Sequence, residues 1–406
     1  MKLAKMAALA ALFALATFPL WALRPAPDGF DKDKLAEIPR RMQELVAKGT
    51  IAGAVTLASC RGEAVSLTAV GYADLFERKP MRPDSLFWIA SMTKPMTAAA
   101  ILMLQDEGKL RVDDPVEKFL PEFKDQWMIQ EKTAHTLLLS RPPRPITLKD
   151  LLTHTSGLGD LPAPRPDCSL AELVMAYARQ PLNFPPGSRW QYSNAGINTL
   201  GRIVEVVSGL KYADFMQKRL FQPLGMKDTT FWPTAAQARR LATSYQPRKD
   251  GSGLEPTPIY FLKGGLSDRS RTAYPAGGLF STAADVHRFY AMALNQGMVK
   301  GKRLLSREAL AQMTSTQTGD IKTGFTEGMS FGLGFAVVKE PQGVTALLAP
   351  GTFGHGGAYG TQSWADPQKN LILILMIQRA KLPNADASEI RQAFQEAAIN
   401  SLTPSR

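Results

Sequence analysis

The chain has 406 residues, of which 45% are hydrophobic, 21% charged and 8% aromatic. These proportions are typical of globular proteins and exclude a disordered, collagen-like or coiled-coil chain. The formal net charge of +12 comes from basic residues scattered singly or in pairs, so it indicates a basic, soluble surface and not a nucleic-acid partner.

The first 22 residues have the pattern of a secretory signal peptide. Lys2 and Lys5 precede an uncharged, mostly apolar run from Met6 to Leu23, and Leu20-Trp21-Ala22 forms an imperfect cleavage site. An uncleaved N-terminal tether stays open, because the run just reaches the lower length limit for crossing a bilayer. We expect a periplasmic or secreted protein with no stable membrane insertion after signal removal.

The residues that follow predict a helix, a hairpin and a helical region. Apolar residues at helical spacing predict an amphipathic helix from Phe30 to Ala47. Ala52 to Ala58 and Ala64 to Tyr72 have the composition of strands, joined through a turn at Cys60-Arg61-Gly62-Glu63. Helices and proline-rich loops then extend from Ser91 to about Tyr274.

Strand patterns return in the last third of the chain. Thr282 to Asn295 predicts a helix, with Asp285 placed for a capping box. The further predicted elements are strands at Phe331 to Val338, Gly360 to Ala365 and Leu371 to Ile377, and a helix at about Ala387 to Leu402.

Strands at both chain ends with helices between them predict a mixed α/β (α+β) fold. We expect an antiparallel sheet built from both ends and flanked by helices, with an inserted, mainly helical region. Residues 28–90 and 280–404 are expected to form the sheet subdomain and residues 91–279 the helical subdomain. The active site is expected between them.

Several chemistries find no support in the sequence. The four histidines have no metal-ligand spacing, and neither a Walker loop nor a dinucleotide fingerprint is present, so we expect no metal and no cofactor. Cys60 and Cys168 are too few for a disulfide scaffold, and the sequence leaves open whether they pair.

Gly328-Met329-Ser330-Phe331-Gly332 matches the GxSxG pattern of a nucleophile elbow. An elbow needs a strand before the serine and a helix after it. Here a loop precedes Ser330 and a strand pattern follows it, and Glu340 is the one acid between Ser330 and His355. We interpret the match as a coincidence.

The stronger signal is Ser91-Met92-Thr93-Lys94. Pro95 is tolerated only near a helix start, which places Ser91 in or next to the first turn of a helix that continues from Thr97 to Leu104. Lys94, three residues further on, shares the face of Ser91 and can reach its hydroxyl. An adjacent amine that loses its proton can activate a serine. The alternative is a serine that only caps the helix.

Two later motifs add polar groups that suit the same chemistry. Tyr192-Ser193-Asn194 opens a predicted helix from Ala195 to Val207 and offers a phenol and an amide to a cleft. Gly354-His355-Gly356-Gly357-Ala358 leads into a strand, where glycines allow close approach of a ligand and backbone N–H groups can form an oxyanion hole. Each motif alone more often marks a structural turn than a catalytic site.

Together these motifs resemble the serine β-lactamase and penicillin-binding superfamily, and most closely class C β-lactamases and the β-lactamase-like family VIII carboxylesterases. The resemblance covers about Phe30 to Leu402 and implies the β-lactamase/transpeptidase-like fold. The similar segments are Phe87 to Lys94, Ile146 to Leu158, Gln222 to Met226 and Ala276 to Thr282.

The resemblance implies that Ser91 is the acylated nucleophile and that Lys94 and Tyr192 form the proton-transfer pair. Either a phenolate, or a neutral amine acting through the phenol, takes the serine proton; a phenolate requires stabilisation by nearby cations. Asn194 is implied to orient the acyl oxygen of the substrate.

The chain departs from lactamases on the edge strand that carries the oxyanion donor. Where lactamases have Lys-Thr/Ser-Gly, this chain has His355-Gly356-Gly357, which the resemblance implies to bind substrate. The backbone N–H groups of Ser91 and Ala358 are implied to form the oxyanion hole. Lys322-Thr323-Gly324 precedes another predicted strand, and we interpret it as a surface-loop match. Loss of the cation is expected to weaken binding of anionic penicillins, whereas an imidazole donates a hydrogen bond or assists proton transfer near neutral pH.

We therefore expect an exported serine hydrolase that cleaves small, uncharged carboxylic esters through an acyl-enzyme on Ser91. A β-lactamase or D-alanyl-D-alanine carboxypeptidase using the same residues stays open, as does a non-catalytic binding or assembly protein on this fold. The expected partner is a small-molecule ester or β-lactam. No pattern in the sequence indicates the preferred acyl or alcohol group of the substrate, or the oligomeric state of the protein. His154 is expected to brace the turn that ends its helix.

Overall fold

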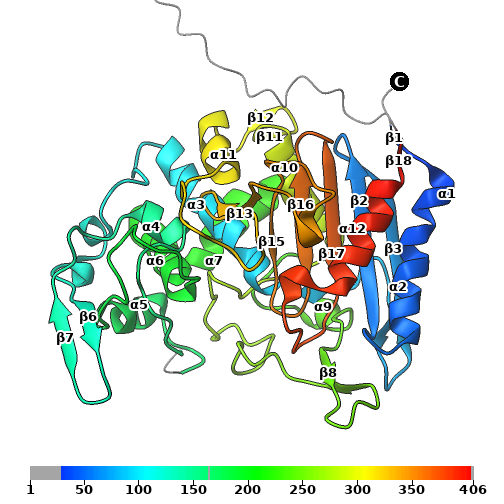
Figure 1. Ribbon diagram of the computed structural model, residues 1–406, viewed down its shortest axis with the longest axis horizontal. Helices are drawn as coiled ribbons and strands as arrows, with labels where there is room; N and C mark the ends of the chain where they lie inside the picture. The colour runs from blue at the N-terminus through cyan, green and yellow to red at the C-terminus, as the bar shows by residue number, and fades with distance from the viewer. Residues whose placement is uncertain (1–28, 163–164, 404–406) are drawn as a thin grey trace, which may run out of the picture.

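The computed structural model describes residues 29–162 and 165–403, and an antiparallel sheet of eight strands forms one part of it, on the right in Figure 1. The strand order is β13-β14-β15-β16-β17-β2-β3-β4, so both ends of the chain build the sheet, as predicted. Its strands are β2 (Gly53–Cys60), β3 (Glu63–Asp74), β4 (Lys79–Pro80), β13 (Met329–Phe331), β14 (Ala336–Val338), β15 (Phe353–Gly356), β16 (Gln362–Asp366) and β17 (Leu371–Met376).

A helix is present in each segment where the sequence predicted one, and further short helices occur that were not predicted individually. The helices nearer the two ends of the chain are α1 (Lys32–Leu35), α2 (Glu37–Ala47), α3 (Lys94–Asp106), α10 (Ala283–Leu294), α11 (Arg307–Thr314) and α12 (Glu389–Asn400). The middle of the chain adds α4 (Leu148–Leu152), α5 (Leu170–Ala178), α6 (Asn194–Ser208), α7 (Tyr212–Phe215), α8 (Gln222–Leu224) and α9 (Ala235–Ala238).

Helices cover both faces of the sheet. On one face α2 and α12 bring Ile38 and Phe394 against Leu373 of β17. On the other face α10 contributes Val286 to a core that includes Ile374 of the same strand. Because successive side chains of a strand point to opposite faces, β17 is buried and apolar along its whole length.

The predicted hairpin between β2 and β3 is confirmed. Arg61 and Gly62 form its two-residue turn with φ of 52° and 81°, the positive values that a type I′ turn requires. Helix α10 begins after Thr282, whose hydroxyl accepts from the Asp285 amide at 3.3 Å. The predicted capping box is not completed, because the Asp285 carboxylate accepts instead from the Asp228 amide at 2.7 Å.

The single strand predicted from Phe331 to Val338 was wrong. The segment forms a hairpin in which β13 and β14 pair across a turn at residues 332–335. Gly334 has φ of 89°, and a Cβ there would lie 2.3 Å from the Ala98 Cβ on α3. The alternating pattern at 331–335 is therefore that of a turn packed on a helix, which glycine permits.

The strand that carries His355 is not an edge strand, contrary to what the resemblance implied. β15 lies between β14 and β16. However, β14 pairs with β15 only at Phe353 and Gly354. His355 and Gly356 lie beyond that pairing. At this end of β15 the backbone is therefore not paired with β14, and it faces the helical region.

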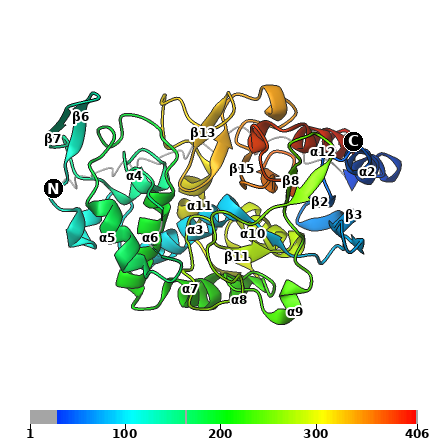
Figure 2. The same cartoon turned by 90° about the horizontal axis from the view of Figure 1, so that it is seen from below.

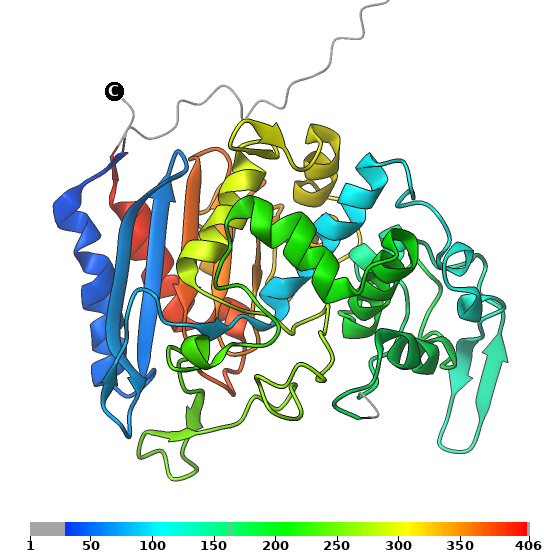
Figure 3. The same ribbon diagram turned by 180° about the vertical axis from the view of Figure 1, so that it is seen from behind.

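Helix α3 connects the two parts of the fold. It runs through the centre, with the sheet on one side and α6 on the other (Figures 1 and 3). Short paired strands complete the structure: β1 (Gly29–Phe30) with β18 (Leu402–Thr403), β5 (Phe87–Trp88) with β10 (Phe280–Ser281), β6 (Met128–Lys132) with β7 (Leu137–Ser140), β8 (Tyr245–Pro247) with β9 (Leu254–Pro256), and β11 (Met298–Val299) with β12 (Lys302–Arg303). The β6–β7 hairpin lies at the opposite end of the molecule from α2 (Figure 2).

Three expectations from the sequence concern the chain ends and the cysteines. The predicted signal peptide, residues 1–22, lies outside the described residues. Within the described part of the chain, no helix has the length and apolar character needed to cross a bilayer. Cys60 and Cys168 are both buried and are not joined to each other by a disulfide.

Candidate active site

Ser91 lies in a single 3-10 turn, η2 (Ala90–Thr93), that runs directly into α3. The two residues before the turn are bonded to one neighbouring segment, since the Ile89 amide donates to the Leu279 carbonyl at 3.0 Å and the Trp88 indole donates to the Gly277 carbonyl at 2.7 Å. Ala90 has φ of 46°, a left-handed conformation that costs free energy for an alanine. Strained backbone thus immediately precedes the serine.

Lys94 is completely buried, and its ammonium group contacts three oxygen atoms. Its Nζ donates to Ser91 Oγ at 3.0 Å, to Asn194 Oδ1 at 2.8 Å and to the Ala276 carbonyl at 2.6 Å. Burial lowers the pKa of Lys94 to about 7, against an opposing effect of the Asp160 carboxylate. A substantial fraction of the amine is therefore unprotonated at neutral pH.

Tyr192 places its phenol on the same serine. Its ring lies 4.6 Å from Lys94 Nζ, and the Ser91 side chain is close enough to its hydroxyl to lower the pKa of the phenol. Burial raises the pKa of Tyr192 far above its usual value, with the Ser91 side chain as a smaller opposing effect. Of the two proton acceptors that the resemblance allowed, this environment disfavours the phenolate.

Asn194 is the first residue of α6, and both ends of its amide are held by the protein. Its Oδ1 accepts from Lys94, and its Nδ2 donates to the Asp160 carboxylate at 2.7 Å. The same carboxylate accepts from the Ala195 amide at 2.7 Å. The sequence analysis missed Asp160, although it follows the similar segment 146–158 by only two residues; an acid in a loop carries no signal of its own.

His154 was expected to brace the turn that ends its own helix, but its ring contacts the segment before α6. Its ring is buried, its Nδ1 accepts from the Ser193 amide at 3.2 Å, and its carbonyl accepts from the Gln191 amide. The imidazole lies 4.5 Å from the Tyr192 ring. Burial holds the pKa of His154 well below its usual value, so the ring is neutral and positions Tyr192 by packing.

His355 lies behind Tyr192, with a distance of 6.1 Å between the ring centroids. Its Nδ1 donates to the Gly356 carbonyl at 2.7 Å. Burial, and secondarily the charge of Lys94, lower the pKa of His355 to about 4. The expectation that this imidazole assists proton transfer near neutral pH is therefore not supported, because the ring stays neutral there.

A pocket of about 520 Å³ opens beside Ser91, and most of its wall is apolar or aromatic. Ser91, Tyr192, Asn194 and Ala358 reach this wall, whereas His355, Gly356 and Gly357 are not among the described residues that line it. The three residues predicted to bind substrate, His355, Gly356 and Gly357, therefore do not line the pocket. The other lining residues are Trp88, Ala90, Asp160, Leu161, Pro162, Tyr177, Asn198, Tyr260, Phe261, Leu262, Lys263, Tyr274, Ala276 and Gly277.

Ala358 reaches the pocket because Gly357 permits a close approach to the nucleophile segment. A Cβ on Gly357 would lie 2.8 Å from the Ile89 carbonyl oxygen and 2.1 Å from Thr361 Oγ1. The chain at 357 therefore packs directly against the residues before Ser91. This packing places Ala358 and Ser91, the two predicted oxyanion donors, on one pocket wall.

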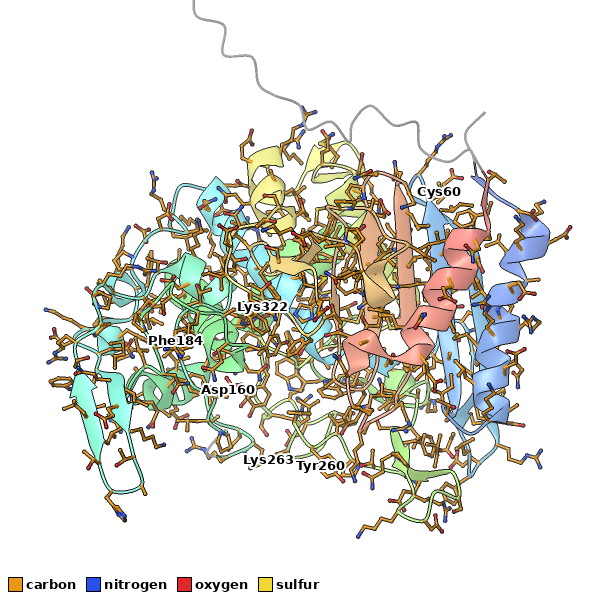
Figure 4. All side chains as sticks on the ribbon, in the orientation of Figure 1. Cys60, Asp160, Phe184, Tyr260, Lys263 and Lys322 are labelled. Carbon is orange, nitrogen blue, oxygen red and sulfur yellow. The ribbon has the colours of Figure 1, made fainter. Side chains whose placement is uncertain are left out.

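The two competing motifs lie elsewhere. Ser330 is buried on β13, where its hydroxyl is 3.0 Å from Thr318 Oγ1, and a hairpin follows it instead of a helix. Lys322 is exposed in the loop before β13 (Figure 4), and it does not line the Ser91 pocket. Across residues 29–162 and 165–403, no group of three or more His, Cys, Asp or Glu side chains is arranged to hold a metal ion.

A serine, a buried lysine and a tyrosine at the junction of a helical region and an antiparallel sheet define a serine hydrolase with the β-lactamase/transpeptidase-like fold. The chain belongs to the beta-lactamase family, whose model matches residues 38–398.

Relatives of known sequence and structure agree with this assignment. Protein Rv1367c of Mycobacterium tuberculosis is 36% identical over 379 residues, which cover 86% of this chain and 90% of the relative. Esterase EstB of Burkholderia gladioli is 31% identical over 398 residues, covering 88% and 94%. The solved structure of EstCE1, a hydrolase with promiscuous acyltransferase activity, has a TM-score of 0.73 at 26% identity and covers 89% of this chain and 98% of its own.

Proposed function

We propose that this serine hydrolase is exported and cleaves small, uncharged carboxylic esters through an acyl-enzyme on Ser91. The observation that carries the proposal is the 3.0 Å contact between Ser91 Oγ and a buried amine whose pKa is lowered to about 7. A serine with such a neighbour loses its proton during attack without a metal or a histidine.

The hydrogen bonds of Lys94 indicate the direction of proton transfer. A neutral amine has two N–H bonds and one lone pair. The Ala276 carbonyl and Asn194 Oδ1 can only accept, so they take the two N–H bonds. The lone pair is then left for the hydroxyl proton of Ser91.

Acylation follows from this arrangement. Ser91 Oγ bonds to the ester carbonyl carbon while its proton moves to Lys94 Nζ. The N–H groups of Ser91 and Ala358 support the oxyanion. The bond to the alkoxy oxygen then breaks, and the proton returns to the departing alcohol. In deacylation, water attacks the acyl carbon while its proton moves to Lys94 Nζ, the bond to Ser91 Oγ breaks, and the proton passes to Ser91 as the acid leaves. Tyr192 lines the same pocket beside both proton transfers.

Two features support uncharged esters as substrates. The residue at the position of the lactamase cation is a neutral imidazole, so no fixed positive charge stands there for a substrate carboxylate. The pocket beside Ser91 is lined mainly by aromatic and aliphatic side chains, which favour an apolar acyl or alcohol group. EstB, a relative over almost its whole length, carries the name esterase.

A β-lactamase or D-alanyl-D-alanine carboxypeptidase is the second candidate, and Lys263 favours it. This exposed lysine lines the same pocket next to Tyr260 (Figure 4) and offers a cation to a substrate carboxylate. A non-catalytic binding protein has less support, because the Ser91, Lys94, Tyr192 and Asn194 contacts are complete.

Acylation experiments separate these candidates. We expect p-nitrophenyl butyrate to give a burst of nitrophenol, and Ser91→Ala to abolish turnover. We expect intact-mass spectrometry to show an acyl adduct with the ester and little or none with a penicillin. Unchanged turnover by Ser91→Ala overturns the assignment, and a stable penicilloyl adduct with nitrocefin hydrolysis favours the second candidate.

A further inference from the structure

Asp160 stands at the end of a chain of hydrogen bonds that leads to the serine. Its carboxylate accepts from Asn194 Nδ2, the Asn194 oxygen accepts from Lys94, and Lys94 contacts Ser91. The Asp160 side chain is exposed at the pocket wall (Figure 4), yet it also accepts from the first-turn amide of Ala195. It is thus fixed to α6 and oriented toward the site.

The chemistry of a carboxylate determines how the Asn194 amide is turned. An ionised carboxylate accepts hydrogen bonds and cannot donate them. Asn194 must therefore direct its NH2 group to Asp160 and its oxygen to Lys94. We infer that Asp160 is a positioning residue, which holds the Asn194 oxygen on Lys94 and so leaves the lysine lone pair free for the Ser91 proton.

The reverse amide orientation shows why this matters. With Asn194 turned over, its NH2 group would point at the neutral amine of Lys94 and occupy the lone pair that the Ser91 hydroxyl needs. An aspartate at 160 prevents this because two oxygens would then face each other, whereas an asparagine at 160 can donate and tolerates it. This inference rests on the proposed role of Lys94 as the base for Ser91.

The charge of Asp160 also acts on Lys94, because it raises the pKa of the amine. Lys94 has Tyr192, His154 and His355 as its other titratable neighbours, and both imidazoles are neutral near pH 7. Asp160 is the negative charge that favours protonated Lys94. Removing it is expected to shift the acid limb of the rate profile to lower pH.

The test compares Asp160→Asn, Asp160→Glu and Asp167→Asn. Asp167 is the matched control, since it is an exposed carboxylate on the same connection, paired with Arg165 at 3.0 Å. For Asp160→Asn we expect kcat on p-nitrophenyl butyrate to fall about tenfold or more, within the usual range for general-base catalysis, with a smaller change in KM. We expect Asp160→Glu to recover part of kcat because it only accepts, and Asp167→Asn to behave as the unmodified protein.

The acid limb of the kcat/KM profile distinguishes a positioning role of Asp160 from a purely structural one, because only the positioning role predicts a shift of the limb in Asp160→Asn. A lower thermal midpoint in Asp160→Asn with unchanged kcat and an unchanged limb overturns the inference. Equal kcat in the Asn and Glu variants also overturns it, because acceptor-only chemistry would then be irrelevant. Should Ser91→Ala retain turnover, the proposed function itself fails; should Ser91→Ala be inactive while Asp160→Asn is fully active, only the role of Asp160 fails.

Discussion

At the scale of single residues, the site depends on one lysine that is expensive to bury. Among the described residues, Lys94 has three neutral acceptors and no carboxylate in direct contact, so its charged form is poorly compensated. The same burial that disfavours the ammonium makes the amine available as a base.

This leads to a prediction for the pH dependence of ester hydrolysis. The folded pKa of Lys94 is depressed to about 7, so the active neutral amine accumulates as the pH rises through that value. We expect kcat/KM for p-nitrophenyl butyrate to rise through pH 7 along a one-proton limb and then to level off. Lys94→Arg should lose at least about 100-fold in kcat, because a guanidinium does not deprotonate.

His355→Asn is the control that assigns this limb. With a pKa of about 4, His355 is already neutral where the limb is expected, and an asparagine amide can replace its Nδ1 hydrogen bond to Gly356. The limb should therefore stay near pH 7 in this variant. Its disappearance in His355→Asn, or a flat profile in the unmodified protein, would contradict the role of Lys94.

The spacing of residues predicted only that Lys94 reaches Ser91; the resemblance to the β-lactamase and penicillin-binding superfamily was needed to add Tyr192 and Asn194 to the site. The serine and lysine lie one helical turn apart, which is a local property. Asp160 was not predicted because its role depends on a contact with α6, thirty-four positions away. The neutral state of His355 was also missed, since burial is a tertiary property.

At the scale of elements, the turn after β15 fixes the distance between the two predicted oxyanion donors. Gly357 lies against the Ile89 carbonyl, and the Ile89 amide is itself bonded to Leu279. The backbone at Ile89 is therefore held in place and cannot easily move away from residue 357. A side chain at 357 would have to push the turn, and Ala358 with it, away from Ser91.

Gly357→Ala is therefore expected to reduce kcat more than stability. Loss of one oxyanion donor typically costs about 100-fold or more in kcat. Steady-state kinetics and thermal unfolding of the same preparation measure both effects. Gly265→Ala serves as the control, because its added Cβ would meet nothing nearer than 3.6 Å. Full kcat in Gly357→Ala would show that the 358 amide is not a donor.

The loop between β9 and β10 supplies an aromatic part of the pocket wall. Phe261 is 63% exposed and stacks on Trp88 with ring centroids 5.8 Å apart. Such a pair can hold a planar group of the substrate between or beside the rings.

We expect Phe261→Ala to discriminate between esters of one acid. An aromatic contact contributes about 0.5–1.5 kcal/mol, so KM for benzyl butyrate should rise about 2- to 12-fold, while ethyl butyrate changes little. Phe76→Ala is the matched control, since Phe76 is 68% exposed and lies in the turn after β3. Equal effects on both esters would exclude an aromatic binding role.

The elements that were predicted correctly are those with a strong local pattern. The β2–β3 hairpin has its own turn residues, and α6 begins at a serine that caps it, where Ser193 Oγ accepts from the Gly196 amide at 3.0 Å. The β13–β14 hairpin was read as one strand because its turn, Gly332 to Phe335, also alternates in hydrophobicity. Only its packing on α3 distinguishes the two.

At the scale of the whole molecule, the two chain ends are joined. β2 and β17 pair in the middle of the sheet, and β1 at Gly29 pairs with β18 at Thr403. Strand patterns at both ends and helical patterns between them predicted one sheet built from both ends, but not the pairing of β1 with β18. The partner of each strand was not predictable, because register across such sequence separation depends on packing of both sheet faces.

The last prediction concerns the 22 residues that precede this closed fold. The described contacts begin at Gly29, so removal of residues 1–22 breaks none of them, and the shortened chain should keep its thermal midpoint and activity. Expressed at full length in a Gram-negative host, the protein should appear in the periplasmic extract with a mass that corresponds to a start at Leu23.

Leu12→Arg with Leu15→Arg interrupts the apolar run and should leave the full-length chain in the cytoplasm, because charged residues in this segment oppose insertion. An uninterrupted chain that keeps its full mass and sediments with membranes would instead establish the N-terminal tether. Full mass in the cytoplasm would contradict export altogether. In each case the hydrolase measured in that fraction is expected to have the same site, since the described contacts of Lys94 with Ser91, Asn194 and Ala276 all join residues beyond 29.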